Sequence, residues 1–167
     1  MPAQIEPARA FVTGIGEEVE PLPDPAPFGV LVLPGTGGLS TPSVYAQADR
    51  MALGREPEDL LGKRAVVRAA ATALPAELVR NDLEAAASAL APGIGPALAD
   101  ARALGADHAM VSGSGPTVIG LFAGPDGPAR ARAAAARAAA SGAHPRAVAA
   151  EPVGPRFARP RVHPTES

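Results

Sequence analysis

The chain has 167 residues, of which 47% are hydrophobic and 3% aromatic, and its formal net charge is −2. This length fits one domain with an aliphatic, alanine-rich core, and the charge provides no basic surface for nucleic acid. The absence of cysteine excludes disulfides and thiolate chemistry, and His108, His144 and His163 are too scattered to predict a metal site. Because there is neither a signal-peptide pattern nor a membrane-length apolar run, we expect a cytoplasmic protein with no membrane partner.

The first part of the chain predicts three strands and a helix. Residues 8–21 contain two short apolar segments around a Gly-Ile-Gly turn, which is typical of paired strands. Residues 28–34, FGVLVLP, form a continuous apolar run, which predicts a strand buried on both faces. After a glycine-rich loop, Ser40 or Thr41 can cap a helix that has Pro42 in its first turn.

The rest of the chain predicts further helices and three strands. In NDLEAAASAL, Asn81 or Asp82 can cap a helix. Residues 107–122, DHAMVSGSGPTVIGLF, predict a strand, a small-residue loop and a second strand. Other helical patterns cover 57–74, 95–105 and the alanine-rich 127–142, and a last strand is expected within 144–153.

Paired strands and runs of helices without an internal repeat predict an α+β fold, with a mainly antiparallel sheet covered by helices. We expect residues 1–152 to form the domain. Residues 153–167 are rich in proline and poor in apolar side chains, which predicts a disordered tail.

Common catalytic motifs are absent or incomplete. The two Gly-x-Gly segments at 35–37 and 113–115 lack the third glycine of a dinucleotide-binding fingerprint, and no phosphate-binding P-loop pattern is present. Ser114 does not form a nucleophile elbow, because Ser112 and Pro116 occupy the positions two residues away that need glycine. Asp107 and His108 precede the small-residue loop, but strand alternation directs them to opposite faces, which disfavours a catalytic triad.

Two segments remain as candidate ligand contacts. The loop at 112–117, SGSGPT, is either an ordinary wide turn or a place where backbone approaches a phosphate. Tyr45, the only tyrosine, follows the predicted cap by one helical turn. Its ring is either a half-buried surface side chain or a platform on which a flat ligand ring stacks.

Four motifs in this order, TGIGEEVEPLP, VLVLPGTGGLSTPSVY, NDLE and GADHAMVSGSGPTVIGLF, carry a resemblance. Together they resemble the C-terminal half of the 4-diphosphocytidyl-2-C-methyl-D-erythritol kinases, a family of the GHMP kinase superfamily in non-mevalonate isoprenoid biosynthesis. The similarity covers residues 2–153. It implies a ferredoxin-like GHMP kinase C-terminal domain and transfer of a phosphoryl group from ATP to a hydroxyl of a cytidyl substrate, with ATP and Mg²⁺ as cofactors.

The resemblance also implies roles for particular residues. Tyr45 would stack on the cytosine ring, and Thr41 and Pro42 would shape the same substrate pocket. The superfamily's third motif, which packs against the ATP-phosphate loop, corresponds to Ser112, Gly113, Ser114, Gly115, Pro116 and Thr117.

The chain departs from the family at its start. The family's phosphate loop would precede Met1. Met1 would stand in the valine position of the family's GxDVP segment, so the catalytic aspartate of that segment would be the residue just before Met1. We therefore expect this chain to be a truncated kinase. The truncation would be natural, the result of a misplaced start codon, or deliberate. It would have no catalytic residue or metal site, bind no cofactor firmly and be inactive alone.

The expected partners are the missing N-terminal half, or a second copy bound through an exposed apolar face. One alternative is a stand-alone binding or dimerisation module of the same fold. Another is a superfamily kinase for a different small alcohol, which would be indifferent to cytosine.

Overall fold

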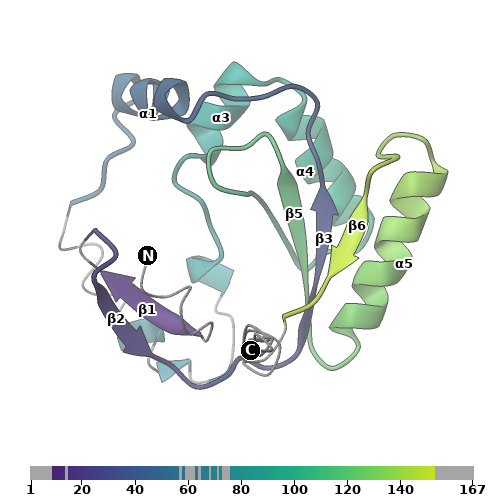
Figure 1. Ribbon diagram of the computed structural model, residues 1–167, viewed down its shortest axis with the longest axis horizontal. Coiled ribbons are helices and arrows are strands. Elements are labelled where there is room, and N and C mark those ends of the chain that lie inside the picture. Colours follow the sequence, from purple (N-terminus) through teal and green to yellow (C-terminus); the bar gives the residue numbers. More distant parts are fainter. Residues whose placement is uncertain are drawn as a thin grey trace, which may run out of the picture.

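The computed structural model describes residues 9–13, 15–56, 58, 63, 65–67, 69, 70, 72 and 76–152. Two antiparallel sheets organise this part of the chain (Figure 1). The smaller is a hairpin of β1 (Ala10–Thr13) and β2 (Glu18–Pro21), with Phe11 opposite Glu20. It confirms the paired strands predicted within residues 8–21. The predicted tail at 153–167 lies outside the described residues.

The larger sheet has four strands in the order β4-β5-β3-β6, and every neighbouring pair is antiparallel. Its strands are β3 (Phe28–Leu33), β4 (His108–Val111), β5 (Val118–Ala123) and β6 (Val148–Ala150). A helical connection joins β3 to β4, a loop joins β4 to β5, and a helix joins β5 to β6. This is the strand–helix–strand–strand–helix–strand arrangement of a ferredoxin-like fold, as expected.

Four α-helices and a short 3-10 helix have both of their ends among the described residues. The α-helices predicted after Ser40, within 95–105 and within 127–142 are confirmed. The predicted helix at 57–74 falls largely outside the described residues. The elements are α1 (Thr41–Arg50), η2 (Ala76–Leu78), α3 (Glu84–Leu90), α4 (Ile94–Ala103) and α5 (Gly127–Ala140). Within the described residues, no helix has the length and apolar character needed to cross a membrane.

Helices α4 and α5 cover the same face of the four-stranded sheet (Figure 1). A Cβ added at Gly29 would lie 2.8 Å from the Ala131 Cβ of α5, and one added at Gly120 would lie 3.5 Å from the Ala101 Cβ of α4. Gly29 and Leu31 are two residues apart on β3, so they lie on the same face of the sheet. Leu31 is directly opposite Gly120 on β5, so Gly120 lies on that face too.

The prediction that residues 28–34 are buried on both faces is therefore wrong. Leu31 and Leu33 are buried beneath the helices, whereas Val30 and Val32 on the opposite face are only partly buried. An antiparallel sheet with helices on one side needs full burial on that side alone. The apolar run did not distinguish this arrangement from a two-sided one, because β3 carries apolar residues on both faces.

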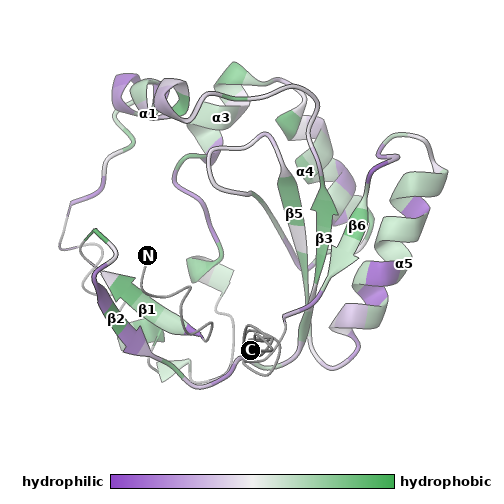
Figure 2. Ribbon diagram, in the orientation of Figure 1, coloured by the Kyte–Doolittle hydropathy of each residue, from purple (hydrophilic) through white to green (hydrophobic). Residues whose placement is uncertain are grey.

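The core between sheet and helices is aliphatic and rich in alanine, as the composition predicted. Phe122, 1% exposed, is the largest fully buried side chain among the described residues. Figure 2 shows apolar residues along β3 and β5, and polar residues on parts of α5. Alanines at 131, 134, 135 and 138 form the buried stripe of α5, so the helix lies close to the strands.

Candidate functional site

Helix α1 presents the three residues predicted to bind substrate. It begins at Thr41, and Pro42 occupies its first turn, where a proline's missing N–H costs no helical hydrogen bond. Ser40 is the N-cap residue, but its side chain forms no capping hydrogen bond. Tyr45 lies one turn further along and is 55% exposed, so much of its side chain is open to a ligand.

The structure brings α1 to the glycine-rich loop between β4 and β5. The Thr41 Oγ1 and Ser114 Oγ atoms lie 2.8 Å apart in a hydrogen bond between residues 73 positions apart. Thr41 was assigned to the substrate pocket and Ser114 to the phosphate-supporting loop. The two predicted groups of residues therefore meet at this hydrogen bond.

The loop from Ser112 to Thr117 has a defined shape. The Ser112 N–H donates to the Thr117 carbonyl at 2.8 Å, and the Gly115 N–H donates to the Ser112 carbonyl at 3.0 Å. Gly113 and Gly115 have φ values of 57° and 79°, which L residues with side chains rarely adopt. The peptide bond before Pro116 is cis.

The two loop glycines have different surroundings. A Cβ at Gly115 would lie 3.1 Å from the Val111 Cγ1 and 3.5 Å from the Ile94 Cδ1, so this residue is packed on the core. A Cβ at Gly113 would meet nothing within 4 Å. The β3–α1 loop also packs closely here, since a Cβ at Gly35 would lie 2.7 Å from Pro116. The loop is thus fixed on its inner side and open at Gly113.

Asn81 and Glu84 also hold this loop, which the sequence did not reveal. The Asn81 Nδ2 donates to the Val111 carbonyl at 2.9 Å and to the Gly113 carbonyl at 2.7 Å. The Glu84 Oε2 accepts the Val111 N–H at 3.0 Å. The helix-cap prediction for Asn81 or Asp82 needs correction, because α3 begins at Glu84 with Leu83 as its N-cap residue. The NDLE motif drew attention to these residues, but no local pattern indicated contacts about 30 positions away.

A known protein family matches the part of the chain that contains these contacts. Residues 65–143 match the family model described as GHMP kinases C terminal. The chain carries a GHMP kinase C-terminal domain. The matched residues include the glycine-rich loop, α3, α4 and all of α5.

Relatives of the GHMP kinase domain include two proteins named 4-diphosphocytidyl-2-C-methyl-D-erythritol kinase. The protein from Streptomyces avermitilis is 39% identical over 131 residues, covering 76% of this chain and 44% of the relative. That from Thermobifida fusca is 44% identical over 132 residues, covering 77% of this chain and 42% of the relative. The chain therefore spans less than half the length of these relatives.

Solved structures show the same fold. The crystal structure of a 4-(cytidine 5'-diphospho)-2C-methyl-D-erythritol kinase matches with a TM-score of 0.59 and 30% identity, over 85% of this chain and 48% of that one. The homoserine kinase of Cytophaga hutchinsonii matches with a TM-score of 0.60 over 92% and 50% of the two chains. At 17% identity, the second match supports the fold alone.

Asp107 of the GHMP kinase domain has a structural role. Its Oδ2 accepts the Ala123 N–H at 2.7 Å, and its Oδ1 pairs with the Arg130 guanidinium at 2.9 Å. The hydrogen bond from Arg130 is the main cause that lowers the Asp107 pKa below its usual range; the Ala123 N–H adds to it, against a desolvation effect in the opposite direction. Both carboxylate oxygens are engaged at the start of β4, away from Ser112 at its end.

We expect Asp107→Asn to lower the free energy of unfolding at neutral pH. A carboxyl group with a depressed pKa in the folded state stabilises the fold above its unfolded-state pKa, near 3.8, and loses this effect as pH falls through the lower folded-state pKa. The difference between wild type and Asp107→Asn should therefore persist from pH 7 to pH 5 and shrink below about pH 4. Urea unfolding at several pH values measures it, with Asp24→Asn as the control for loss of an exposed charge. A difference that stays constant down to pH 3 would contradict the assigned pairing.

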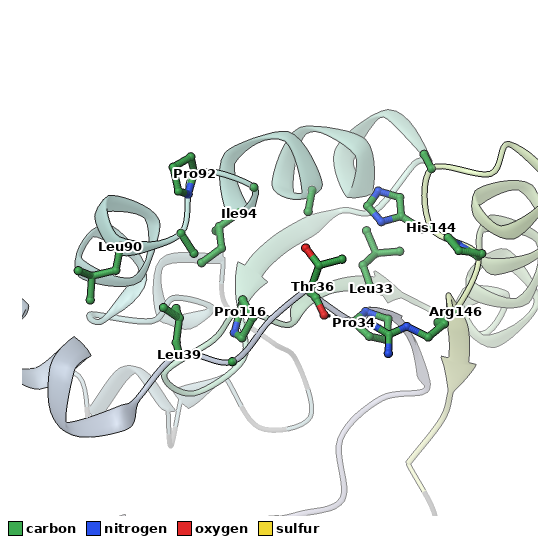
Figure 3. Close-up of a pocket in the computed structure, with 17 residues that line it drawn as sticks. Leu33, Pro34, Thr36, Leu39, Leu90, Pro92, Ile94, Pro116, His144 and Arg146 are labelled. Atoms are coloured by element: carbon green, nitrogen blue, oxygen red, sulfur yellow. Dashed lines mark hydrogen bonds between the residues drawn. The ribbon is translucent and has the colours of Figure 1, made fainter.

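A groove of about 520 Å³ adjoins the glycine-rich loop at Pro116 (Figure 3). Of the predicted site residues it includes Pro116, but not Thr41, Tyr45 or Ser114. The groove has apolar walls, to which Leu33, Leu39, Ile94 and Ala97 contribute. Thr36 lies between Pro116 and Leu33 in the close-up view. At one end the His144 Nε2 lies 2.9 Å from the Asp100 Oδ2, and the Arg146 Nη2 donates to the Gly35 carbonyl at 3.2 Å.

Proposed function

We propose that this chain provides the substrate-side wall of a small-molecule kinase that transfers the γ-phosphoryl group of ATP to a hydroxyl of a cytidyl-bearing alcohol. The observation that carries the proposal is the 2.8 Å hydrogen bond between the Thr41 and Ser114 hydroxyl oxygens. It places the exposed Tyr45 ring and the open backbone of Gly113 on neighbouring elements. The names of the relatives support the same substrate class.

Each part of this surface has a proposed role. The Tyr45 ring stacks on cytosine, and Thr41 and Pro42 shape the side of the pocket at the start of α1. The loop from Ser112 to Thr117 lies next to the nucleotide phosphates, where backbone N–H groups favour anions. Among the described residues, no group of three or more histidine, aspartate or glutamate side chains could hold a metal ion. We therefore assign no step involving Mg²⁺ to this part of the protein.

Cytidine diphosphate is expected to bind this chain, and Tyr45→Ala is expected to weaken binding about tenfold, because stacking of a base on an aromatic ring contributes roughly 1–3 kcal/mol. Isothermal titration with cytidine diphosphate measures this effect. Tyr45→Phe is the matched control and should bind nearly as well as wild type, because it keeps the ring.

Two results of this titration would contradict the proposal. One is the absence of any saturable heat with cytidine diphosphate. The other is equal affinity of wild type and Tyr45→Ala, which would favour a kinase whose substrate lacks a stacked base.

A second candidate function is a stand-alone binding or dimerisation module. The partly exposed apolar face of the sheet, which includes Val30, Val32, Ile119 and Leu121, favours it. This candidate predicts concentration-dependent dimerisation in light scattering and no response to cytidine diphosphate. A monomer at all concentrations that binds the nucleotide would exclude it.

A further inference from the structure

The NDLE segment is not among the proposed ligand contacts, yet its Asn81 and Glu84 side chains bond to the backbone of Val111 and of the glycine-rich loop that follows it. Asn81 uses both hydrogens of its side-chain amide, on the carbonyls of Val111 and Gly113. Its Oδ1 accepts the Leu83 N–H at 3.0 Å. These three contacts fix the orientation of the amide, because a flipped group would direct its oxygen at two carbonyl oxygens.

Holding a carbonyl also fixes the N–H on the other side of the same peptide group. In a trans peptide the C=O of one residue and the N–H of the next point in opposite directions. The bond between Gly115 and Pro116 is the cis peptide of this loop, so the Gly113–Ser114 peptide is trans. With the Gly113 carbonyl bound to Asn81, the Ser114 N–H must point away from Asn81.

The same geometry can be checked one peptide earlier. Asn81 binds the Val111 carbonyl, and the next N–H, that of Ser112, points away from Asn81 and donates to the Thr117 carbonyl at 2.8 Å. The Ser114 N–H differs, because the described part of the chain offers it no acceptor. At Gly113, which precedes it, an added Cβ would meet nothing within 4 Å, and the φ is 57°.

An N–H held in a fixed direction without an acceptor is suited to an anion. We propose that Asn81 is a positioning residue that orients the Ser114 N–H towards a phosphate oxygen of the bound nucleotide, and that Glu84 supports it by fixing Val111. This inference rests on the proposed function for the identity of the nucleotide. Asn81 itself does not contact the ligand.

The test compares ligands with and without a diphosphate in the full chain. In amide NMR spectra, cytidine diphosphate and inorganic pyrophosphate should both shift the Ser114 N–H saturably, whereas cytidine should shift only the Tyr45 ring signals. Asn81→Ala should abolish the Ser114 shift and reduce the affinity advantage of cytidine diphosphate over cytidine about tenfold, the usual size of one hydrogen bond to a charged group. The response of Tyr45 to cytidine should remain, which a general loss of structure would not allow.

Two further variants test whether the effect comes from the hydrogen bonds that the Asn81 amide donates, and not from a change of charge or a loss of folding in this segment. Asn81→Asp has nearly the same shape but cannot donate to the two carbonyls, so it should behave as Asn81→Ala does. Asp82→Asn is the matched control, because Asp82 pairs with Arg55 and Arg80 and not with the loop. It should keep both responses.

The possible outcomes decide between the two proposals. A Ser114 shift of equal size in wild type and Asn81→Ala, or no Ser114 shift with pyrophosphate in wild type, would overturn the inference about Asn81. A wild-type chain in which pyrophosphate shifts Ser114, while cytidine and cytidine diphosphate leave Tyr45 unchanged, would overturn the proposed function but support the oriented anion site.

Discussion

Gly127→Ala is expected to lower the free energy of unfolding by about 3 kcal/mol, the upper part of the usual range for an overpacked core. A Cβ at this position would lie 2.0 Å from the Phe122 carbonyl oxygen and 3.0 Å from the Gly29 nitrogen. Both contacts are with backbone, so no side chain can move aside. Because Phe122 lies in β5 and Gly29 in β3, α5 would have to shift from both strands, which disturbs the main packing of the domain.

Urea unfolding measures this effect, and two other glycine variants complete the comparison. Gly29→Ala should be destabilised similarly, because its Cβ would lie 2.4 Å from the Gly127 carbonyl oxygen. Gly95→Ala in α4 is the control, since its Cβ would meet nothing within 4 Å, and its stability should be unchanged or slightly raised. Equal stabilities of Gly127→Ala and Gly95→Ala would contradict the close contact of α5 with β5 and β3.

Phosphoryl transfer by this chain alone is expected to lie below detection. The chain spans 44% and 42% of the length of two kinase relatives, and no described residue has been assigned as the general base. Loss of a general base alone lowers the rate by about 10²–10⁴-fold, and phosphoryl transfer depends further on groups that hold phosphates and metal. Under the proposed function, these groups come from the part of the family's fold that the chain does not match.

A coupled assay of ADP formation measures this activity with ATP, Mg²⁺ and 4-diphosphocytidyl-2-C-methyl-D-erythritol. Adding the N-terminal half of a relative such as the Thermobifida fusca kinase as a separate chain should restore substrate-dependent ADP formation. Tyr45→Ala in the same mixture should raise the KM for the cytidyl substrate. Turnover by this chain alone at the rate of the mixture would contradict the prediction.

Much of the fold was predictable because its signals are local. Paired apolar segments around a turn indicated β1 and β2, Pro42 marked the start of α1, and the alanine-rich run at 127–142 indicated α5. The sequence of β3 alone did not predict whether helices cover one face or both faces of the four-stranded sheet. That property depends on where α4 and α5 lie, and both helices are on one side of the sheet.

The candidate site was predictable in its parts but not in its assembly. Small residues at 112–117 and the single tyrosine at 45 were recognisable as unusual, and the resemblance to a kinase family gave them roles. The hydrogen bond between Thr41 and Ser114 joins residues 73 positions apart, and the bonds from Asn81 to Val111 and Gly113 join residues 30 and 32 positions apart. Side-chain bonds of this kind depend on the tertiary fold, so they leave no periodic pattern in the sequence.

The most direct test of the proposed substrate-side wall is an NMR measurement of nuclear Overhauser effects between cytidine diphosphate and the chain. Tyr45 is the only tyrosine, so its ring signals identify it without ambiguity. We predict cross-peaks from the cytosine H5 and H6 protons to the Tyr45 ring. A bound nucleotide whose cytosine protons show cross-peaks to other side chains, and none to Tyr45, would contradict the account.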